Sequence, residues 1–243
     1  MVNSETLPPV RTTHLWRAPG GLWCYDMWGR HGRPVLFLPA VMFDRVMWWP
    51  AAADLRAHAT VIAVDLPGHG ASTGRDRYDP YELVDDLAQL LHSVGTHRAP
   101  VVVGHASSAP LAVLFAASYA THAVVTVDAP QSTNCPTDLA QYLDDMQLEA
   151  VAAPYRDMLT PGRDPRLLAA YAPCRTAGDP PAVGADTATA PHRLAVHSQA
   201  PPRRHPDPGT PPDPWRHEVY DVPGRFAHLA DVPRFVRDIR AVL

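Results

Sequence analysis

Residues 101–109, VVVGHASSA, constrain the fold of this chain more than any other stretch. The stretch starts with three consecutive valines, which are typical of a short strand buried on both faces of a sheet. The apolar run breaks at small residues and continues into an apolar helix that we expect over 111–120. Gly104 and Ser108 are small enough to let the strand and the helix approach each other closely. The stretch therefore predicts a buried strand, a tight turn and a helix.

Predicted strands and helices alternate along most of the chain. One antiparallel hairpin is expected within 12–28, around Pro19-Gly20-Gly21. The alternation that follows predicts an α/β fold with a doubly wound, mostly parallel sheet. The other predicted strands are 34–38, 61–64, 123–127, 194–197 and 217–222, and the other predicted helices are 44–55, 80–94 and 231–243, the last with Asp231 as its N-cap.

A segment in the second half of the chain interrupts this alternation. Residues 130–191 carry only two weak helical patterns, over 139–152 and 165–171, and we expect them to form a cap over the carboxyl edge of the sheet. The proline-rich run 201–214 is predicted to be a loop. The predicted organisation is a core of residues 1–129 and 192–243 with residues 130–191 as a small cap insertion.

Length and charge narrow the class of protein. A chain of 243 residues that is 46% hydrophobic suits one α/β domain with a substantial core. A net charge of −4 gives no reason to expect binding to nucleic acid or to an anionic membrane surface. The cysteines Cys24, Cys135 and Cys174 form no C-x-x-C pair, which favours reduced thiols. With no signal peptide and no membrane-spanning run in this sequence, we expect a cytoplasmic protein.

Motifs for metals and nucleotides are missing from the sequence. It contains no zinc-ligand spacing, no P-loop and no G-x-G-x-x-G. We therefore expect no cofactor, and a small molecule as the partner. The sequence does not indicate an oligomeric state.

Two turns carry a resemblance to a known superfamily. The strand, turn and helix of residues 101–120 resemble the nucleophile elbow of the α/β-hydrolase superfamily, whose usual motif is G-x-S-x-G. Residues 65–72, DLPGHGAS, resemble the D-x-P-G-x-G-x-S turn of the same superfamily. The resemblance implies an α/β-hydrolase fold in which Ala106 stands at the nucleophile position and leaves it vacant. A register shifted by one would make Ser107 the nucleophile, but His105 would then crowd a turn that has almost no room for a side chain.

On this fold the catalytic groups follow the order nucleophile, acid, histidine. His228 lies in GRFAHLADVP, just before the final predicted helix, and is our candidate base. Asp128 ends the strand that follows the elbow and is our candidate acid, since the penultimate strand is followed by no carboxylate until Asp207. A carboxylate bonded to one imidazole nitrogen fixes the tautomer and leaves the other nitrogen as a base.

The residues that follow the first parallel strand are expected to complete the site. The backbone N–H groups of Val41 and Ser107 are the predicted oxyanion hole. The predicted substrate-binding residues lie on the loop after that strand and at the elbow; they are Met42, Phe43, Trp48 and Ser108, in an apolar wall that includes Met47 and Trp49.

One branch of the superfamily resembles the chain more closely. Residues 36–46, LFLPAVMFDRV, and the position of Asp128 are similar to those of the cofactor-independent dioxygenases that open the ring of hydroxyquinolones. In that branch a His–Asp dyad removes a substrate proton, and the resulting anion reacts directly with O2. The branch has a serine followed by a histidine at the elbow, where this chain has Ala106 and Ser107, and a histidine in place of Phe43. The C-terminal residues that carry the resemblance are Ser198-Gln199, Pro214-Trp215, Gly224, His228 and Asp231-Val232-Pro233.

Three hypotheses for the function follow. In the first, His228 and Asp128 deprotonate a small hydroxyaromatic or polyketide-like substrate, with O2 as co-substrate if the outcome is dioxygenation, or with cyclisation, elimination or C–C cleavage in secondary metabolism. In the second, the chain is a serine hydrolase of the esterase or thioesterase type that has lost its nucleophile to Ala106. In the third, it is a non-catalytic binding protein on this scaffold.

Overall fold

A computed structural model of the chain describes residues 11–130, 136–175, 190–201 and 213–243. Their strands form one eight-stranded sheet in the order β1-β2-β4-β3-β5-β6-β7-β8. β1 and β2 pair antiparallel, β2 pairs antiparallel with β4, and all other pairs are parallel. The predicted mostly parallel sheet is confirmed. The strands are β1 (Arg11–Ala18), β2 (Gly21–Trp28), β3 (Arg33–Leu38), β4 (Ala59–Val64), β5 (Val101–His105), β6 (Ala123–Val127), β7 (His192–His197) and β8 (Arg216–Val219).

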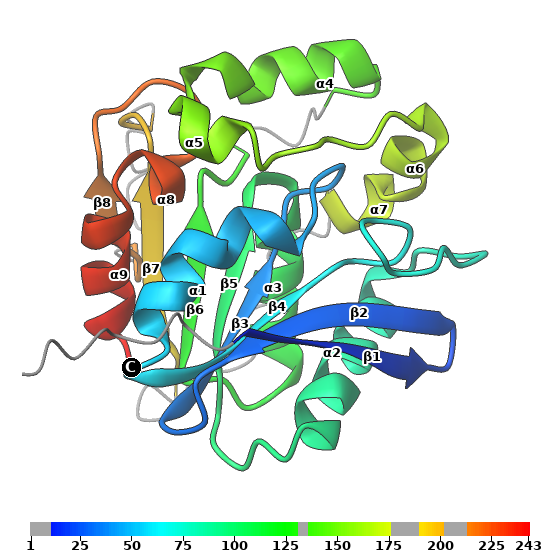
Figure 1. Ribbon diagram of the computed structural model, residues 1–243, viewed down its shortest axis with the longest axis vertical. Helices are drawn as coiled ribbons and strands as arrows, with labels where there is room; N and C mark the ends of the chain where they lie inside the picture. Colours follow the sequence, from blue (N-terminus) through cyan, green and yellow to red (C-terminus); the bar gives the residue numbers. More distant parts are fainter. Residues whose placement is uncertain (1–10, 131–135, 176–189, 202–212) are drawn as a thin grey trace, which may run out of the picture.

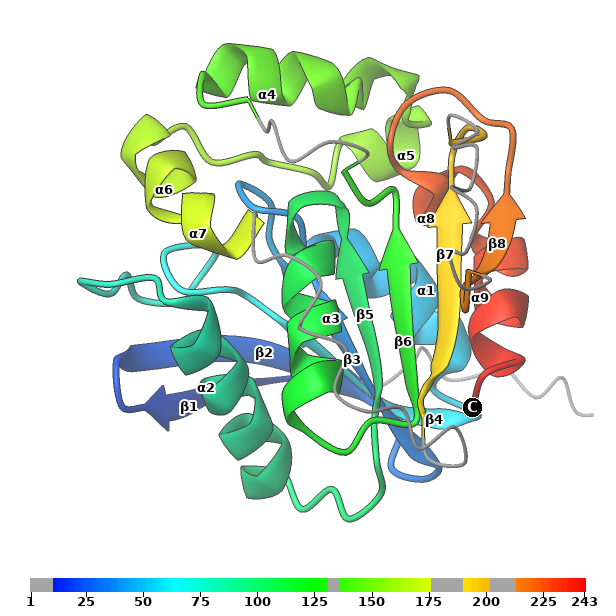
Figure 2. The same ribbon diagram turned by 180° about the vertical axis from the view of Figure 1, so that it is seen from behind.

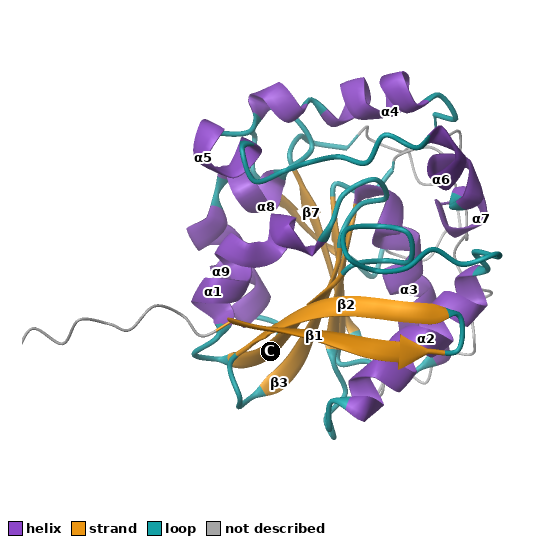
Figure 3. Ribbon diagram, turned by 45° about the vertical axis from the view of Figure 1, so that its right-hand side comes forward, coloured by secondary structure: helices purple, strands orange, loops and turns teal. Residues whose placement is uncertain are grey.

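Helices cover both faces of this sheet. α1, α8 and α9 lie on one face, and α2 and α3 lie on the other (Figures 1 and 2). The view turned to the side shows the strands between these two helical layers (Figure 3). Every residue of β5 is buried, as the apolar run at this position predicts. The helices of the two layers are α1 (Trp49–Leu55), α2 (Pro80–Ser93), α3 (Ala109–Ser118), α8 (Ala227–Ala230) and α9 (Val232–Arg240).

The segment between β6 and β7 lies outside the sheet and its two helical layers. The helices of this segment lie beyond the ends towards which β5, β6 and β7 point, which are the carboxyl ends of the parallel strands (Figure 1). They are α4 (Leu139–Met146), α5 (Ala153–Arg156), α6 (Pro165–Ala170) and α7 (Ala172–Arg175), with a 3-10 turn at Leu148–Ala150. A search of the described helices for a membrane-spanning segment finds none with the required length and hydropathy.

Some predicted helices are shorter than expected, for local reasons. The one expected over 44–55 is divided into a 3-10 turn, Arg45–Trp48, and α1, because Pro50 has no N–H to donate and fits only the first turn of a helix. The one expected over 139–152 ends at Met146, where Gln147 takes a left-handed conformation with φ 51°. Asp231 caps α9 as predicted, accepting a hydrogen bond from the Arg234 N–H at 3.0 Å. Most of the predicted loop 201–214 is outside the described residues.

Candidate functional site

The turn after β5 is a strained one. Ala106 has φ 44°, a conformation in which a non-glycine residue is uncommon, and the chain then enters α3 through the turn Ala106–Ser108. A Cβ on Gly104 would lie 2.6 Å from the Ser108 carbonyl oxygen, so the strand and helix approach as closely as the sequence predicts. Ala106 lines a cavity at this point and presents only a methyl group to it.

A closed ring of hydrogen bonds lies beside Ala106. The Val41 N–H donates to the Ser107 hydroxyl at 2.9 Å, and this hydroxyl lies 2.8 Å from the Tyr142 hydroxyl. The Tyr142 hydroxyl in turn donates to the Val41 carbonyl oxygen at 2.9 Å. The predicted oxyanion hole therefore differs from what the structure shows, since the Val41 N–H is already occupied by a side chain of the elbow.

Asp128, at the end of β6, lines the same cavity and has φ 49°. Its carboxylate accepts hydrogen bonds from the Ser198 N–H at 2.6 Å, the Ser198 hydroxyl at 2.9 Å and the Ala227 N–H at 3.0 Å. Both carboxylate oxygens are thus engaged by Ser198, the residue that follows β7, and by Ala227, the residue before His228. The described residues show no hydrogen bond between Asp128 and the His228 ring, so the predicted dyad is not formed.

The His228 ring lies inside the core. It is 0% exposed, and its centroid lies 4.4 Å from that of Trp48 and 4.8 Å from that of His105. Neither ring nitrogen has a hydrogen-bond partner within the described part of the chain. Burial, with a smaller contribution from His105, lowers the pKa of His228 well below its usual value of 6.5. His228 is therefore uncharged at neutral pH and does not line the cavity.

The predicted substrate-binding residues also lie in the core. Phe43 packs edge-on against Phe226 with centroids 5.5 Å apart, and the Ser108 hydroxyl donates to the Pro39 carbonyl oxygen. We predicted that these residues form a pocket wall, and the structure instead packs their side chains inside the core, where they have almost no exposed surface. The residues concerned are Met42, Phe43, Trp48 and Ser108, all buried and none lining the cavity.

The turn at 65–72 fixes the loop after β3. His69 accepts a hydrogen bond from the Met42 N–H at 2.8 Å, and its other ring nitrogen lies 3.1 Å from the Pro67 carbonyl oxygen. The ring is thereby satisfied as a neutral tautomer that donates from Nδ1. Burial lowers the pKa of His69 to about 4. His69 thus fixes the backbone of the loop after β3, and both of its ring nitrogens are already engaged.

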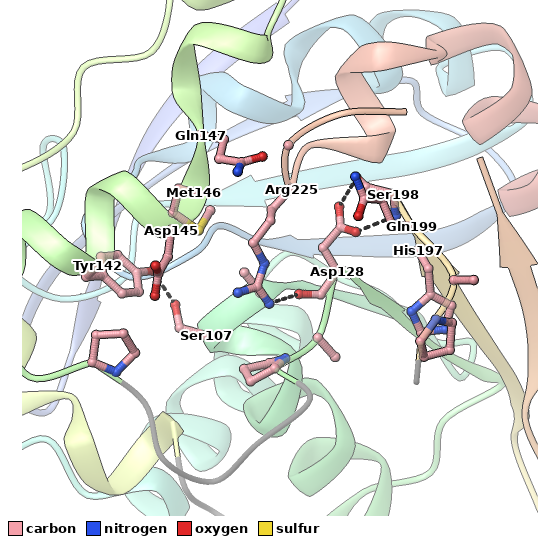
Figure 4. A pocket seen from close by; sticks show the side chains of 17 residues that line it. Ser107, Asp128, Tyr142, Asp145, Met146, Gln147, His197, Ser198, Gln199 and Arg225 are labelled. Atoms are coloured by element: carbon pink, nitrogen blue, oxygen red, sulfur yellow. Dashed lines mark hydrogen bonds between the residues drawn. The ribbon is translucent and has the colours of Figure 1, made fainter. Parts of the chain in front are cut away.

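The cavity has a volume of about 490 Å³ and is lined from the sheet, from α4 and from the loop before α8 (Figure 4). This size is in the range of small-molecule sites. Several polar residues that line it were missed in the sequence because each is of a type common on surfaces, and only Arg225 among them stands in a motif that we quoted, the one that holds His228. They are Tyr142, Asp145, Gln147, His197 and Arg225.

His197 begins a chain of hydrogen bonds that leads away from the cavity. Its Nε2 lies 2.9 Å from Nδ1 of His217, and Nε2 of His217 lies 2.9 Å from a carboxylate oxygen of Asp213. Burial and the neighbouring His217 lower the pKa of His197, which favours its uncharged form. Among the described residues no cluster of histidine, cysteine, aspartate or glutamate has the arrangement to hold a metal ion.

The sequence of most of the chain matches a known family. Residues 31–241 match the model of the alpha/beta hydrolase family, so the chain belongs to that family. No sequence among the curated proteins matches it.

Solved structures share the fold at low sequence identity. A thermophilic esterase from Thermogutta terrifontis is 18% identical with a TM-score of 0.69, the match covering 95% of this chain and 97% of the esterase. The enol-lactonase from Burkholderia xenovorans LB400 is 16% identical with a TM-score of 0.70, covering 94% and 99%. The Cif epoxide hydrolase from Acinetobacter nosocomialis is 14% identical with a TM-score of 0.71, covering 96% and 89%.

Proposed function

We propose that this alpha/beta hydrolase family protein binds a small molecule related to hydrolase substrates in its cavity and forms no acyl-enzyme at its elbow. The observation that carries the proposal is Ala106. It occupies the strained turn that faces the cavity, where the fold presents its nucleophile, and a methyl group cannot attack a carbonyl. The esterase and lactonase with this fold support ester-like or lactone-like ligands.

Two further features support the loss of covalent chemistry. A base must come within hydrogen-bond reach of the proton it removes, and the His228 ring is enclosed by Trp48 and His105 instead. The Val41 N–H, which would hold an oxyanion, is bonded to Ser107. The Ser107 N–H remains our predicted second donor.

Cofactor-independent dioxygenation in secondary metabolism has less support. It requires His228 and Asp128 to act together on a substrate, and the carboxylate of Asp128 is bonded to Ser198 and Ala227 instead. The structural neighbours named above are hydrolases. An oxygen electrode with hydroxyquinolones tests this alternative: consumption of O2 that is lost in His228→Ala would restore it.

The main test is covalent labelling. Wild-type protein, Ala106→Ser and Ser107→Ala are incubated with a serine-directed fluorophosphonate and analysed by intact-protein mass spectrometry, in parallel with hydrolysis of aryl esters. We expect no adduct on the wild type and ester hydrolysis at the rate of buffer. Ala106→Ser should be labelled more than the wild type, because it restores a hydroxyl at the strained turn. Stoichiometric labelling of the wild type that disappears in Ser107→Ala would contradict the proposal and identify a hydrolase with a shifted nucleophile.

Two broader expectations belong to this proposal. We propose that residues 130–191 act as a cap, supported by the α4 side chains that line the cavity. We also propose a cytoplasmic location, which agrees with the free thiols of Cys24 and Cys174. Cell fractionation with an antibody against the protein would test the location.

A further inference from the structure

Arg225 is a cation of the cavity that pairs with no carboxylate among the residues that the structure describes. Its guanidinium lies in the middle of the labelled side chains of the pocket, between Ser107 and Asp128 (Figure 4). Nη2 donates to the backbone carbonyl oxygen of Asp128 at 2.9 Å. The ion pairs found among the described residues do not include Arg225. Because a guanidinium carries several N–H donors in a planar fork, most of its hydrogen-bonding capacity is unused.

Both the backbone and the guanidinium of Arg225 are held by hydrogen bonds. Its own carbonyl oxygen lies 2.6 Å from Nε2 of His105, a buried residue of β5, and this ring nitrogen must donate to it. The preceding Gly224 has φ 80°, and a Cβ there would lie 3.1 Å from the Cβ of Ala150. The backbone is thus fixed beneath the segment that follows α4, while Asp128 holds the guanidinium. A side chain oriented before binding loses less conformational entropy when a ligand arrives.

The acids of the cavity are not the partners of this guanidinium. The Asp128 carboxylate is engaged by Ser198 and Ala227. Asp145 is an exposed residue of α4 that lines the cavity, and the ion pairs of the described residues do not join it to Arg225. The lining of the cavity therefore carries one cation, Arg225, and two carboxylates, Asp128 and Asp145. His197 adds no second cation in its favoured, uncharged form. These two carboxylates repel a dianion such as a phosphate monoester more strongly than a ligand with a single negative charge.

We propose that Arg225 binds the carboxylate of a small organic monoanion in this cavity. The fork of the guanidinium matches the two oxygens of a carboxylate, and such bidentate pairs are among the stronger hydrogen-bonded contacts in proteins. The inference rests on the proposed function, since it names the ligand class of the same cavity. A carboxylate is also the group released when an ester or lactone is hydrolysed, which agrees with the hydrolase neighbours.

The test measures binding of matched probes by isothermal titration calorimetry. Acetate, butyrate, hexanoate and benzoate are compared with benzamide, the uncharged counterpart of benzoate, and with phenyl phosphate. We expect saturable binding of at least one carboxylate. We expect benzoate to bind more tightly than benzamide and phenyl phosphate. Absence of binding by every carboxylate, or equal affinity for benzoate and benzamide, would overturn the inference.

Variants assign the binding to Arg225. Arg225→Gln should weaken carboxylate binding about tenfold to a hundredfold, and Arg225→Lys should fall between, since it keeps the charge and loses the fork. Asp145→Asn should strengthen binding a few-fold, because it removes a like charge from the cavity. Arg237→Gln, at an exposed position of α9 that does not line the cavity, is the matched control and should bind as the wild type does. Thermal unfolding of each variant shows that the fold is retained. Unchanged binding in a folded Arg225→Gln or Arg225→Lys protein would contradict the assignment.

The two proposals fail separately. Covalent labelling or ester turnover by the wild type would refute the loss of acyl-enzyme chemistry and leave the carboxylate site standing if Arg225→Gln still loses binding. If no carboxylate binds and the wild type is not labelled, the carboxylate inference is refuted and the proposed absence of an acyl-enzyme stands.

Discussion

Arg225 and His228 are close in sequence, and the structure places them in opposite surroundings. Arg225 lines the cavity, and hydrogen bonds from His105 and to Asp128 hold its backbone and its guanidinium. The His228 ring is buried against Trp48, and its nitrogens have no partner among the described residues. Arg225 is held by hydrogen bonds, whereas the His228 ring has none within the described residues. We therefore expect their substitution to change the free energy of unfolding differently. This difference underlies our proposal that Arg225 binds the ligand, and it leads us to expect that the buried His228 ring lowers the stability of the fold.

Acid provides the largest test of the buried histidines. Burial lowers the pKa of His69 and His105 to about 4, and that of His228 well below 6.5, so all three stay uncharged in the folded chain while the unfolded chain binds protons. Their contribution to stability is complete above pH 6.5 and is lost as pH falls towards 4. The loss is about 1.4 kcal/mol per pH unit for each histidine, or about 4 kcal/mol per unit together.

Urea unfolding at several pH values measures this slope. In His228→Phe the slope below pH 6.5 should decrease by about one proton per molecule. An unchanged slope would mean that the His228 ring titrates as it does in the unfolded chain, and thus reaches solvent.

The next effect concerns the Asp128 carboxylate, which is bonded to Ser198 and to Ala227, the latter lying between Arg225 and His228 in the sequence. Asp128→Ala removes the acceptor of two backbone N–H groups and a hydroxyl, and leaves alanine at φ 49°. We expect a loss of about 3 kcal/mol or more in the free energy of unfolding, measured with urea at pH 7. Asp128→Asn keeps one acceptor oxygen and tolerates the left-handed conformation, so it should cost less. Equal costs for the two variants would mean that these hydrogen bonds do not stabilise the fold.

The smallest effect compares two buried histidines directly. His228→Phe removes ring nitrogens that have no partner within the described residues and should raise the free energy of unfolding by about 1 kcal/mol. His69→Phe breaks bonds to Met42 and Pro67 and should lower it by about 2 kcal/mol. Calorimetric melting at pH 7.5 measures both. Destabilisation by both substitutions would indicate that His228 has a partner in solution, such as a buried water.

Much of the fold was predictable because its signals are local. The valines of β5 and the small residues around Ala106 specify a buried strand and a tight turn without reference to the rest of the chain. The same holds for the hairpin around Pro19-Gly20-Gly21 and for Asp231 as a cap.

The site was less predictable because it depends on contacts between distant segments. The position of His228 can be inferred from the sequence, but the direction of its ring depends on packing against Trp48. Arg225 stands beside it in the same motif, and its role depends on carbonyl and ring contacts with β5 and β6. Tyr142 contacts Val41 although the two residues are far apart in the sequence, and no local sequence pattern predicts such a contact.

The ring formed by Val41, Ser107 and Tyr142 joins three segments through two hydroxyl groups. Tyr142 belongs to α4, whereas Val41 and Ser107 follow β3 and β5. If α4 moves away from the sheet by the length of one hydrogen bond, the Val41 carbonyl and the Ser107 hydroxyl lose a partner in the same step. The same movement of α4 would then widen the cavity and expose the polar groups at its base. A ligand large enough to displace α4 would therefore find its polar contacts uncovered together, and smaller ligands would find them closed.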